Sequence, residues 1–133
     1  MRLQLPSLLI TDDDLDFRET LRAVFEPRFH TILAGDGQEA LDIVREQEVH
    51  LLLLDMHMPR LTGLETLRQV KQFKSRLPCI LISAGLDENL ADAARQANAF
   101  SVLPKPISRR ELTSTVELAM RRIYNWGADD PAA

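Results

Sequence analysis

Asp55 is the residue of this sequence best placed to do chemistry, because it follows four consecutive leucines at 51–54. Such a run is typical of a strand buried on both faces of a parallel sheet, which tolerates a charged side chain at its end but not in its interior. Three other short apolar runs also end in reactive polar groups: Asp12 with Asp13, Ser83, and Lys105. The four polar ends together predict one functional site.

The residue types at these ends point to phosphoryl transfer. Converging carboxylates of Asp12, Asp13 and Asp55 would repel one another unless a cation neutralised part of their charge. Their oxygen atoms suit Mg²⁺ or Mn²⁺ better than Zn²⁺. Lys105 adds a positive charge and Ser83 a hydroxyl donor, and both groups stabilise a phosphoryl group during its transfer. Asp55, after the central strand, is the predicted nucleophile, and its product would be an acyl phosphate.

The segments between these groups alternate between strand and helix patterns. We expect strands at 8–10, 29–33, 51–54, 79–83 and 100–103, and helices at 14–25, 37–47, from 62 or 63 to before 78, at 87–97, and from 108. This alternation predicts a three-layer α/β domain with a parallel sheet and helices on both faces. Ligands of such sheets lie beyond the carboxyl ends of the strands, so the five polar residues should meet at one edge.

Local signals define the ends of several elements. Asn98 is expected to end the fourth helix in a left-handed conformation, and Ser108 to cap the last one. The fourth helix has mainly alanine at its apolar positions, so we expect it to be the most loosely held. We predict one domain at 7–124, a tail at 1–6, and a tail at 125–133 that is frayed from Trp126 onward.

Composition excludes several classes of protein. The 133 residues include 16 basic and 20 acidic ones, without a basic cluster long enough to follow a nucleic-acid backbone. No apolar stretch could span a bilayer and the first residues do not resemble a signal peptide, so we expect a cytoplasmic protein without direct nucleic-acid or membrane binding. The single cysteine, Cys79, lies in an apolar run and is expected to be a buried hydrophobic residue.

Four ordered motifs resemble the receiver domain of two-component response regulators: 11–14, 55–59 with Gly63, 83–84, and Lys105-Pro106. The resemblance implies a flavodoxin-like, doubly wound five-stranded sheet in the order 2-1-3-4-5 with five helices. It implies phosphorylation of Asp55 by a histidine kinase or phosphotransfer protein, with signalling through the face of the fourth helix, fifth strand and fifth helix. The partners would include a downstream protein or an output domain, and a phosphorylation-dependent dimer is possible.

The same resemblance assigns roles within the site. Asp12 and Asp13 would hold Mg²⁺ together with Asp55 and the backbone carbonyl of His57. Ser83 and Lys105 would contact the phosphoryl group, and the Lys105-Pro106 peptide bond would be cis. The domain would not be an enzyme, beyond self-phosphorylation from small phosphodonors and autodephosphorylation.

The sequence departs from the family at Val102, where related domains usually carry Tyr or Phe. Without a ring to reorient, the coupling of Asp55 to the signalling face is expected to be altered. Phe100, expected on the same side of the strand, is a candidate substitute. His57 and Gly85 match positions that flank the route of the attacking water, although we favour a surface histidine at position 57 that contributes only its carbonyl.

Two other functions stay open at this stage. One is a receiver-like module that binds partners regardless of phosphorylation, an alternative that Val102 keeps open. The other is an aspartate-nucleophile phosphohydrolase, which would need an acid where His57 stands and a cap over its substrate. Taken singly, each motif has a commoner structural explanation, such as acidic residues at a helix N-terminus for 12–14.

Overall fold

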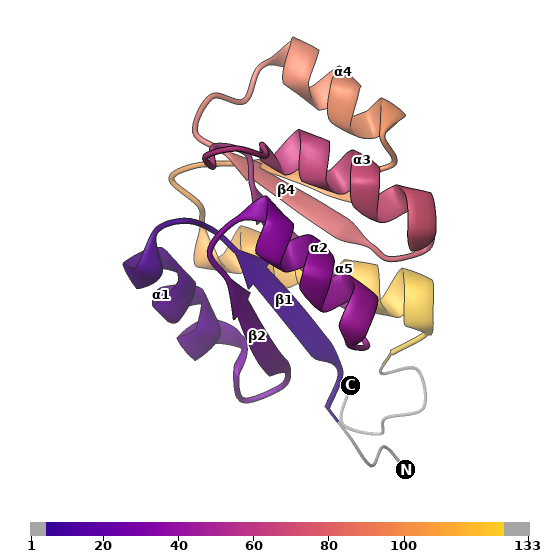
Figure 1. Cartoon of the computed structure of the whole chain (residues 1–133). Coiled ribbons are helices and arrows are strands. Elements are labelled where there is room, and N and C mark those ends of the chain that lie inside the picture. The colour runs from indigo at the N-terminus through magenta and orange to yellow at the C-terminus, as the bar shows by residue number, and fades with distance from the viewer. Residues whose placement is uncertain (1–4, 127–133) are drawn as a thin grey trace.

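The computed structural model describes residues 5–126 and contains one five-stranded parallel sheet in the order β2-β1-β3-β4-β5. The strands are β1 Ser7–Thr11, β2 His30–Ala34, β3 Leu51–Asp55, β4 Cys79–Ser83 and β5 Ser101–Pro104. The helices are α1 Leu15–Phe25, α2 Gly37–Glu46, α3 Gly63–Phe73, α4 Glu88–Gln96 and α5 Arg109–Tyr124. The predicted α/β architecture and strand order are confirmed (Figure 1).

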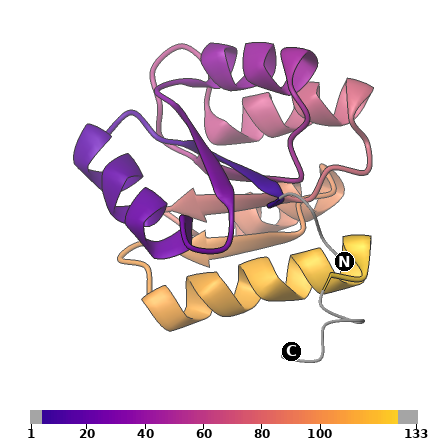
Figure 2. The ribbon, with the colours of Figure 1, turned by 90° about the horizontal axis from the view of Figure 1, so that it is seen from below.

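Helices cover both faces of the sheet, so the core has two halves. The half under α1 and α5 includes Leu51 and Leu53, and the half under α2, α3 and α4 includes Leu52 and Leu54. Figure 2 shows α2 and α3 on one side of the sheet and α5 on the other. Successive side chains of a strand point to opposite faces, which explains why four consecutive leucines are needed in a strand buried on both sides.

Each helix begins with a polar residue whose side chain accepts a hydrogen bond from the first turn. The N-caps are Asp14, Asp36, Thr62, Asp87 and Ser108. These side chains satisfy backbone N–H groups that have no partner within the helix. The cap predicted at Ser108 is confirmed, and so is the left-handed conformation of Asn98, with φ 65°.

Strands β2 and β5 begin one residue later than the sequence predicted. The expected starts were Phe29 and Phe100, but the strands begin at His30 and Ser101. Both phenylalanines precede the regular pairing and turn into the core half under α1 and α5. Val102 packs in the opposite half, so the prediction that Phe100 lies on the same side as Val102 is wrong.

Trp126, predicted to lie in a frayed tail, packs against the folded domain. Its ring centroid lies 5.6 Å from that of Phe29, and the Arg28 guanidinium lies 4.4 Å from the indole. The interpretation of Trp126 as frayed is therefore wrong, while the rest of the predicted tail, 127–133, lies outside the described residues, as do residues 1–4.

Helix α4 buries little of its surface, as the sequence predicted. Ala94 is its only fully buried residue, with Leu90 and Ala97 partly buried against the core. Small side chains remove little apolar area from water, so α4 gains less from packing than the other helices. Within residues 5–126, no helix is long and apolar enough to cross a membrane.

Candidate functional site

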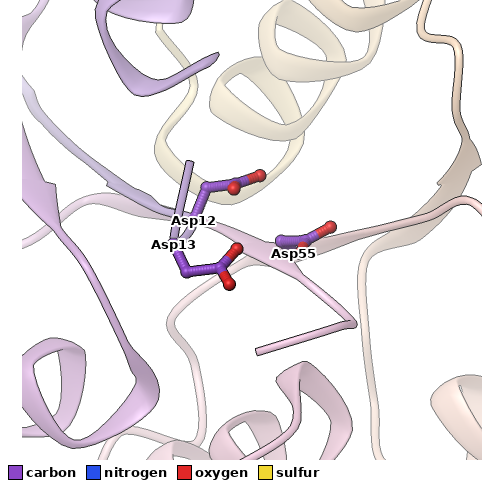
Figure 3. Close-up of side chains that lie close together, drawn as sticks. All are labelled: Asp12, Asp13 and Asp55. Carbon is purple, nitrogen blue, oxygen red and sulfur yellow. The ribbon is translucent and has the colours of Figure 1, made fainter. Parts of the chain in front are cut away.

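The five predicted site residues lie at the carboxyl edge of the sheet. Asp12 and Asp13 follow β1, Asp55 ends β3, Ser83 ends β4, and Lys105 follows β5. One carboxylate oxygen from each aspartate lies within 4.8 Å of the others. Figure 3 shows these three carboxylates gathered at the ends of β1 and β3. Parallel strands bring residues up to 93 positions apart, such as Asp12 and Lys105, into contact.

Two of the three carboxylates are buried, and burial makes their ionised forms less favourable. Asp12 is 1% exposed and Asp55 is 4% exposed, whereas Asp13 faces solvent. Burial raises the pKa of Asp12 above its ordinary value, opposed by a 2.8 Å hydrogen bond from the Asp14 backbone N–H and reinforced by the charge of Asp55. The ionised form of Asp12 is therefore disfavoured in the folded protein.

Lys105 supplies the one ammonium group in contact with these carboxylates among the described residues. Its Nζ lies 2.9 Å from Asp55 Oδ1 and 3.2 Å from Asp12 Oδ2. Burial lowers the pKa of Lys105, but hydrogen bonds to Asp55 and Asp12 outweigh this and hold it above its ordinary value. The ammonium also lies 4.4 Å from the centre of the Phe17 ring, a cation–π contact from α1.

The donor set fits a hard divalent cation. Three carboxylates face one ammonium, which leaves two negative charges uncompensated at an edge where two of the acids are buried. All the available ligand atoms are oxygens, and no described cysteine or histidine nitrogen belongs to this cluster. Oxygen-only clusters of this charge are typical of Mg²⁺ sites and not of zinc sites.

Ser83 is fully buried, and its hydroxyl is held between two groups. Its Oγ accepts a 3.1 Å hydrogen bond from the Gly85 N–H and lies 3.3 Å from His57 Nε2. His57 is exposed, as predicted, and its ring makes a contact with this hydroxyl that the sequence did not predict. A side chain at Gly85 would approach the same ring. A Cβ there would lie 3.6 Å from His57 Nε2, an ordinary van der Waals contact, so the ring borders this position without filling it.

The loop after Asp55 is anchored at both ends. The Gly63 N–H donates a 2.9 Å hydrogen bond to Met56 O, and a Cβ at Gly63 would collide with the Asp55 carbonyl oxygen. Arg60, with φ 69°, donates a 2.7 Å hydrogen bond to the Asp36 carboxylate that caps α2. Close backbone approach explains the glycine in this motif. The Lys105-Pro106 peptide bond is cis, as the resemblance implied.

A family model described as "Response regulator receiver domain" matches residues 8–117, most of the chain. This chain belongs to the response regulator receiver domain family. The edge bearing Asp12, Asp13, Asp55, Ser83 and Lys105 is called the acidic pocket below. The resemblance read from the four sequence motifs is confirmed.

Relatives and solved structures agree with this assignment. The receiver domain is 35% identical over 127 residues to "Response regulator MprA" of Mycobacterium sp. (strain KMS), covering 94% of this chain and 55% of that protein. It is 34% identical over 119 residues to "Response regulator RR06" of Streptococcus pneumoniae, covering 89% and 54%. The chain thus spans about half the length of the curated relatives it matches.

Solved receiver domains have the same fold. A response regulator receiver domain protein from Clostridium thermocellum superposes with a TM-score of 0.83 at 26% identity, covering 89% of this chain and 96% of that one. A CheY-like receiver domain protein from Methanospirillum hungatei gives 0.88 at 20% identity, covering 92% and 98%, which supports the fold alone.

Sequence reasoning missed three contacts of this receiver domain. Phe17 was taken only as an apolar residue of α1, but it also supports the Lys105 ammonium. Arg60 was not singled out, and the ring of His57 was not expected to contact Ser83. An aromatic residue four positions after Asp13 was the one available signal for the first contact, but its meaning depends on where the helix places it.

Proposed function

We propose that this receiver domain accepts a phosphoryl group on Asp55 in a reaction that depends on Mg²⁺ or Mn²⁺. The observation that carries the proposal is the setting of the Asp55 carboxylate. It is 4% exposed, in contact with the Lys105 ammonium at 2.9 Å, and within 4.8 Å of the Asp12 and Asp13 carboxylates. A nucleophile, acidic ligands for a cation and a fixed positive charge are the groups that phosphoryl transfer requires.

Asp12, Asp13, Asp55 and the backbone carbonyl of His57 would hold the cation. When bound, Mg²⁺ supplies positive charge that lets a phosphoryl group approach this acidic edge. Because Asp12 and Asp55 are buried, their carboxylate oxygens are not solvated separately by bulk water. They stay directed at the place where the cation would bind.

The chain's own groups divide the remaining work. One Asp55 oxygen forms a bond to the phosphorus of a phosphohistidine donor. The bond from phosphorus to the imidazole nitrogen breaks, and that nitrogen keeps the electron pair. Lys105, already within hydrogen-bond reach of Asp55, donates to a phosphoryl oxygen. The Ser83 hydroxyl would exchange its contact with His57 for a second phosphoryl oxygen.

The donor would be a phosphohistidine on a sensor kinase or phosphotransfer protein, and the signal would leave through α4, β5 and α5. In this receiver domain Val102 packs in the core half under α2, α3 and α4, beside a helix that buries little. A shift of α4 is therefore the motion that a displaced Ser83 would produce most readily. The same proposal includes a downstream partner or output domain and a phosphorylation-dependent dimer. It also includes domain boundaries at 7–124 and a cytoplasmic location.

A second candidate function is partner binding regardless of phosphorylation. Val102 favours it, because a valine has no ring whose position could report the movement of Ser83. Since Phe100 packs on the opposite side of the sheet, it does not supply the missing ring on that side.

Incubation with acetyl phosphate or phosphoramidate tests the proposal. In the presence of Mg²⁺ we expect intact mass measurement to show one added phosphoryl group on the wild type and none on Asp55→Asn. Removing the cation with EDTA should abolish the phosphoryl adduct on the wild type. Asp42→Asn is the matched control, since Asp42 is an exposed carboxylate on α2.

Absence of an adduct on the wild type under every donor and cation would contradict the proposal. Intact binding to partners in that case would support the second candidate function. An adduct on Asp55→Asn would show that another residue is the phosphoacceptor.

A further inference from the structure

A groove lies at the amino-terminal edge of the sheet, opposite the acidic pocket, with a volume of about 1120 Å³. Pro78 and Phe100, which directly precede β4 and β5, line it together with the carboxyl-terminal ends of α3 and α5 and the α4–β5 turn. Figure 1 shows α3, α4 and α5 ending on the same side of the molecule. The proposed phosphorylation chemistry uses none of these residues.

The groove is basic although the chain carries a net charge of −4. Five of its lining residues are cationic and none is acidic. The cationic residues are Lys71, Lys74, Arg76, Arg95 and Arg122. This concentration of one charge sign gives the amino-terminal edge a field opposite to that of the acidic pocket.

The ordinary explanation for basic residues here is that they complement the carboxyl ends of helices. It accounts for Lys71, which donates hydrogen bonds to the backbone carbonyls of Ser75 and Leu77, and Arg95 is paired with Asp92. The positions of Lys74 at the C-cap of α3 and of Arg122 in the last turn of α5 fit the same explanation, whereas Arg76 lies beyond the end of α3. What sets Lys74, Arg76 and Arg122 apart from Lys71 and Arg95 is that their charges are not paired. They are exposed, and within residues 5–126 they have no ion pair within 4.0 Å.

The same groove also collects exposed apolar side chains. Among the described residues six large hydrophobic side chains are exposed, and three of them, Phe73, Ile123 and Tyr124, line this groove. Apolar groups scattered over a surface need no explanation, but their concentration in one concavity bordered by cations is typical of a binding surface.

We propose that this groove, lined by Lys74, Phe73, Arg122 and Ile123, docks an acidic, amphipathic segment of a partner protein. Carboxylates of the segment would meet the rim cations, and one or two of its apolar side chains would lie against Phe73 and Ile123. Charge complementarity selects this occupant. Carboxylates on a peptide can reach separate rim cations, so they need not share one buried point.

Phosphate ligands fit the groove less well. Phosphate sites use the N–H groups and positive dipole of a helix N-terminus, whereas α3, α4 and α5 present their carboxyl-terminal ends here. Nucleic acid would also need basic residues extending along a backbone path, but these cations surround a single concavity.

Fluorescence anisotropy on the full chain tests the proposal with a labelled 12-residue peptide that alternates Glu with Leu and Phe. We expect binding in the range of roughly 10–100 µM, weakening with added salt. Replacing each Glu of the peptide by Gln should remove binding. A Lys74→Gln/Arg122→Gln variant should bind the acidic peptide about tenfold more weakly, the effect of losing two exposed charge contacts.

The matched control is Arg109→Gln/Arg110→Gln, which removes two exposed charges at the other end of α5 and should bind as the wild type does. Amide chemical shifts should change at Leu77, Ala99 and Tyr124 and stay unchanged at Asp55. Circular dichroism verifies that both variants fold. No binding of the acidic peptide, or equal loss in both variants, would overturn the proposal, as would tighter binding of ATP or a single-stranded oligonucleotide in the same groove.

Discussion

At the scale of the residue, repulsion between the carboxylates of the acidic pocket opposes their attraction to Lys105. Asp12 is buried beside Asp55 and contacts Lys105 at 3.2 Å, yet its pKa is raised, because burial and the neighbouring carboxylate together outweigh its favourable contacts. Without a bound cation, the ionised form of Asp12 therefore opposes folding.

Asp12→Asn is predicted to stabilise the fold in EDTA at pH 7 by on the order of 1 kcal/mol. Because folding raises the pKa of Asp12, ionisation of this group lowers the free energy of unfolding as the pH rises from 3.8 through the raised value. Asparagine does not titrate, so the variant does not lose stability in this way. The advantage should therefore be absent in acid and complete at neutral pH. Urea unfolding of both proteins, with and without Mg²⁺, measures it.

Mg²⁺ supplies the contrasting condition for that measurement. Under the proposed function, the cation should stabilise the wild type more than the variant, because it would bind the native acidic pocket and the substitution would replace one of its carboxylate ligands by a neutral amide. Asp42→Asn controls for a general change in net charge. An Asp12→Asn protein less stable than the wild type in EDTA would show that the contact with Lys105 outweighs the repulsion.

At the scale of the element, helix caps connect the fold to the site. Asp36 caps α2 by accepting a 2.8 Å hydrogen bond from the Glu39 N–H, and its other oxygen accepts from Arg60 in the loop after Asp55. The Glu39 hydrogen bond, followed by the contact with Arg60, lowers the pKa of Asp36. One carboxylate thus starts a helix and restrains the loop that carries His57.

Asp36→Ala is predicted to lower the free energy of unfolding by about 1–2 kcal/mol at pH 7, the usual cost of removing an N-cap. Because folding lowers the pKa of Asp36, its contribution is present above pH 3.8 and is lost as pH falls through the lowered value. The difference between wild type and variant should shrink accordingly in denaturation measured from pH 7 to pH 3.

Asp36→Asn is the informative partner of that variant, because asparagine caps helices about as well as aspartate but carries no charge. We expect it to recover most of the stability and none of the pH dependence. Equal losses for Ala and Asn would instead assign the effect to the ion pair with Arg60.

At the scale of the whole molecule, the two edges of the sheet have opposite electrical character. The carboxyl edge gathers Asp12, Asp13 and Asp55, and the amino-terminal edge gathers the cations of the groove. Between them lies a core of leucine, isoleucine and valine side chains that also contains Cys79. The thiol is 1% exposed, and burial raises its pKa to about 12.

Cys79 is therefore predicted to report global unfolding. In the native protein at pH 8, a thiol reagent should react on the order of a thousandfold more slowly than in denaturant, because the buried thiol is neutral and becomes accessible only when the core opens. Absorbance measured with a disulfide reagent gives both rates.

A Cys79→Ala/Gln72→Cys protein is the control, since Gln72 is exposed on α3 and its thiol should react at once in the native state. Rapid modification of native wild type would mean that β4 opens locally, without unfolding of the rest of the sheet.

The sequence by itself determined the elements, the parallel sheet and the gathering of the five candidate site residues at one edge. These depend on local periodicity and on polar residues at strand ends, which are properties of short segments. Its errors at Phe29, Phe100 and Trp126 concern residues beside an element, where no repeating pattern applies. Packing against the core decided their positions.

Only the tertiary structure decided how side chains from different elements meet. The contact of Lys105 with Phe17, that of His57 with Ser83, that of Arg60 with Asp36, and the groove formed by the ends of three helices all join residues far apart in the chain. Periodicity within one segment predicts which face a residue occupies. It carries no information on what another segment places opposite that face, because the relative position of two elements is set by the packing of the entire core.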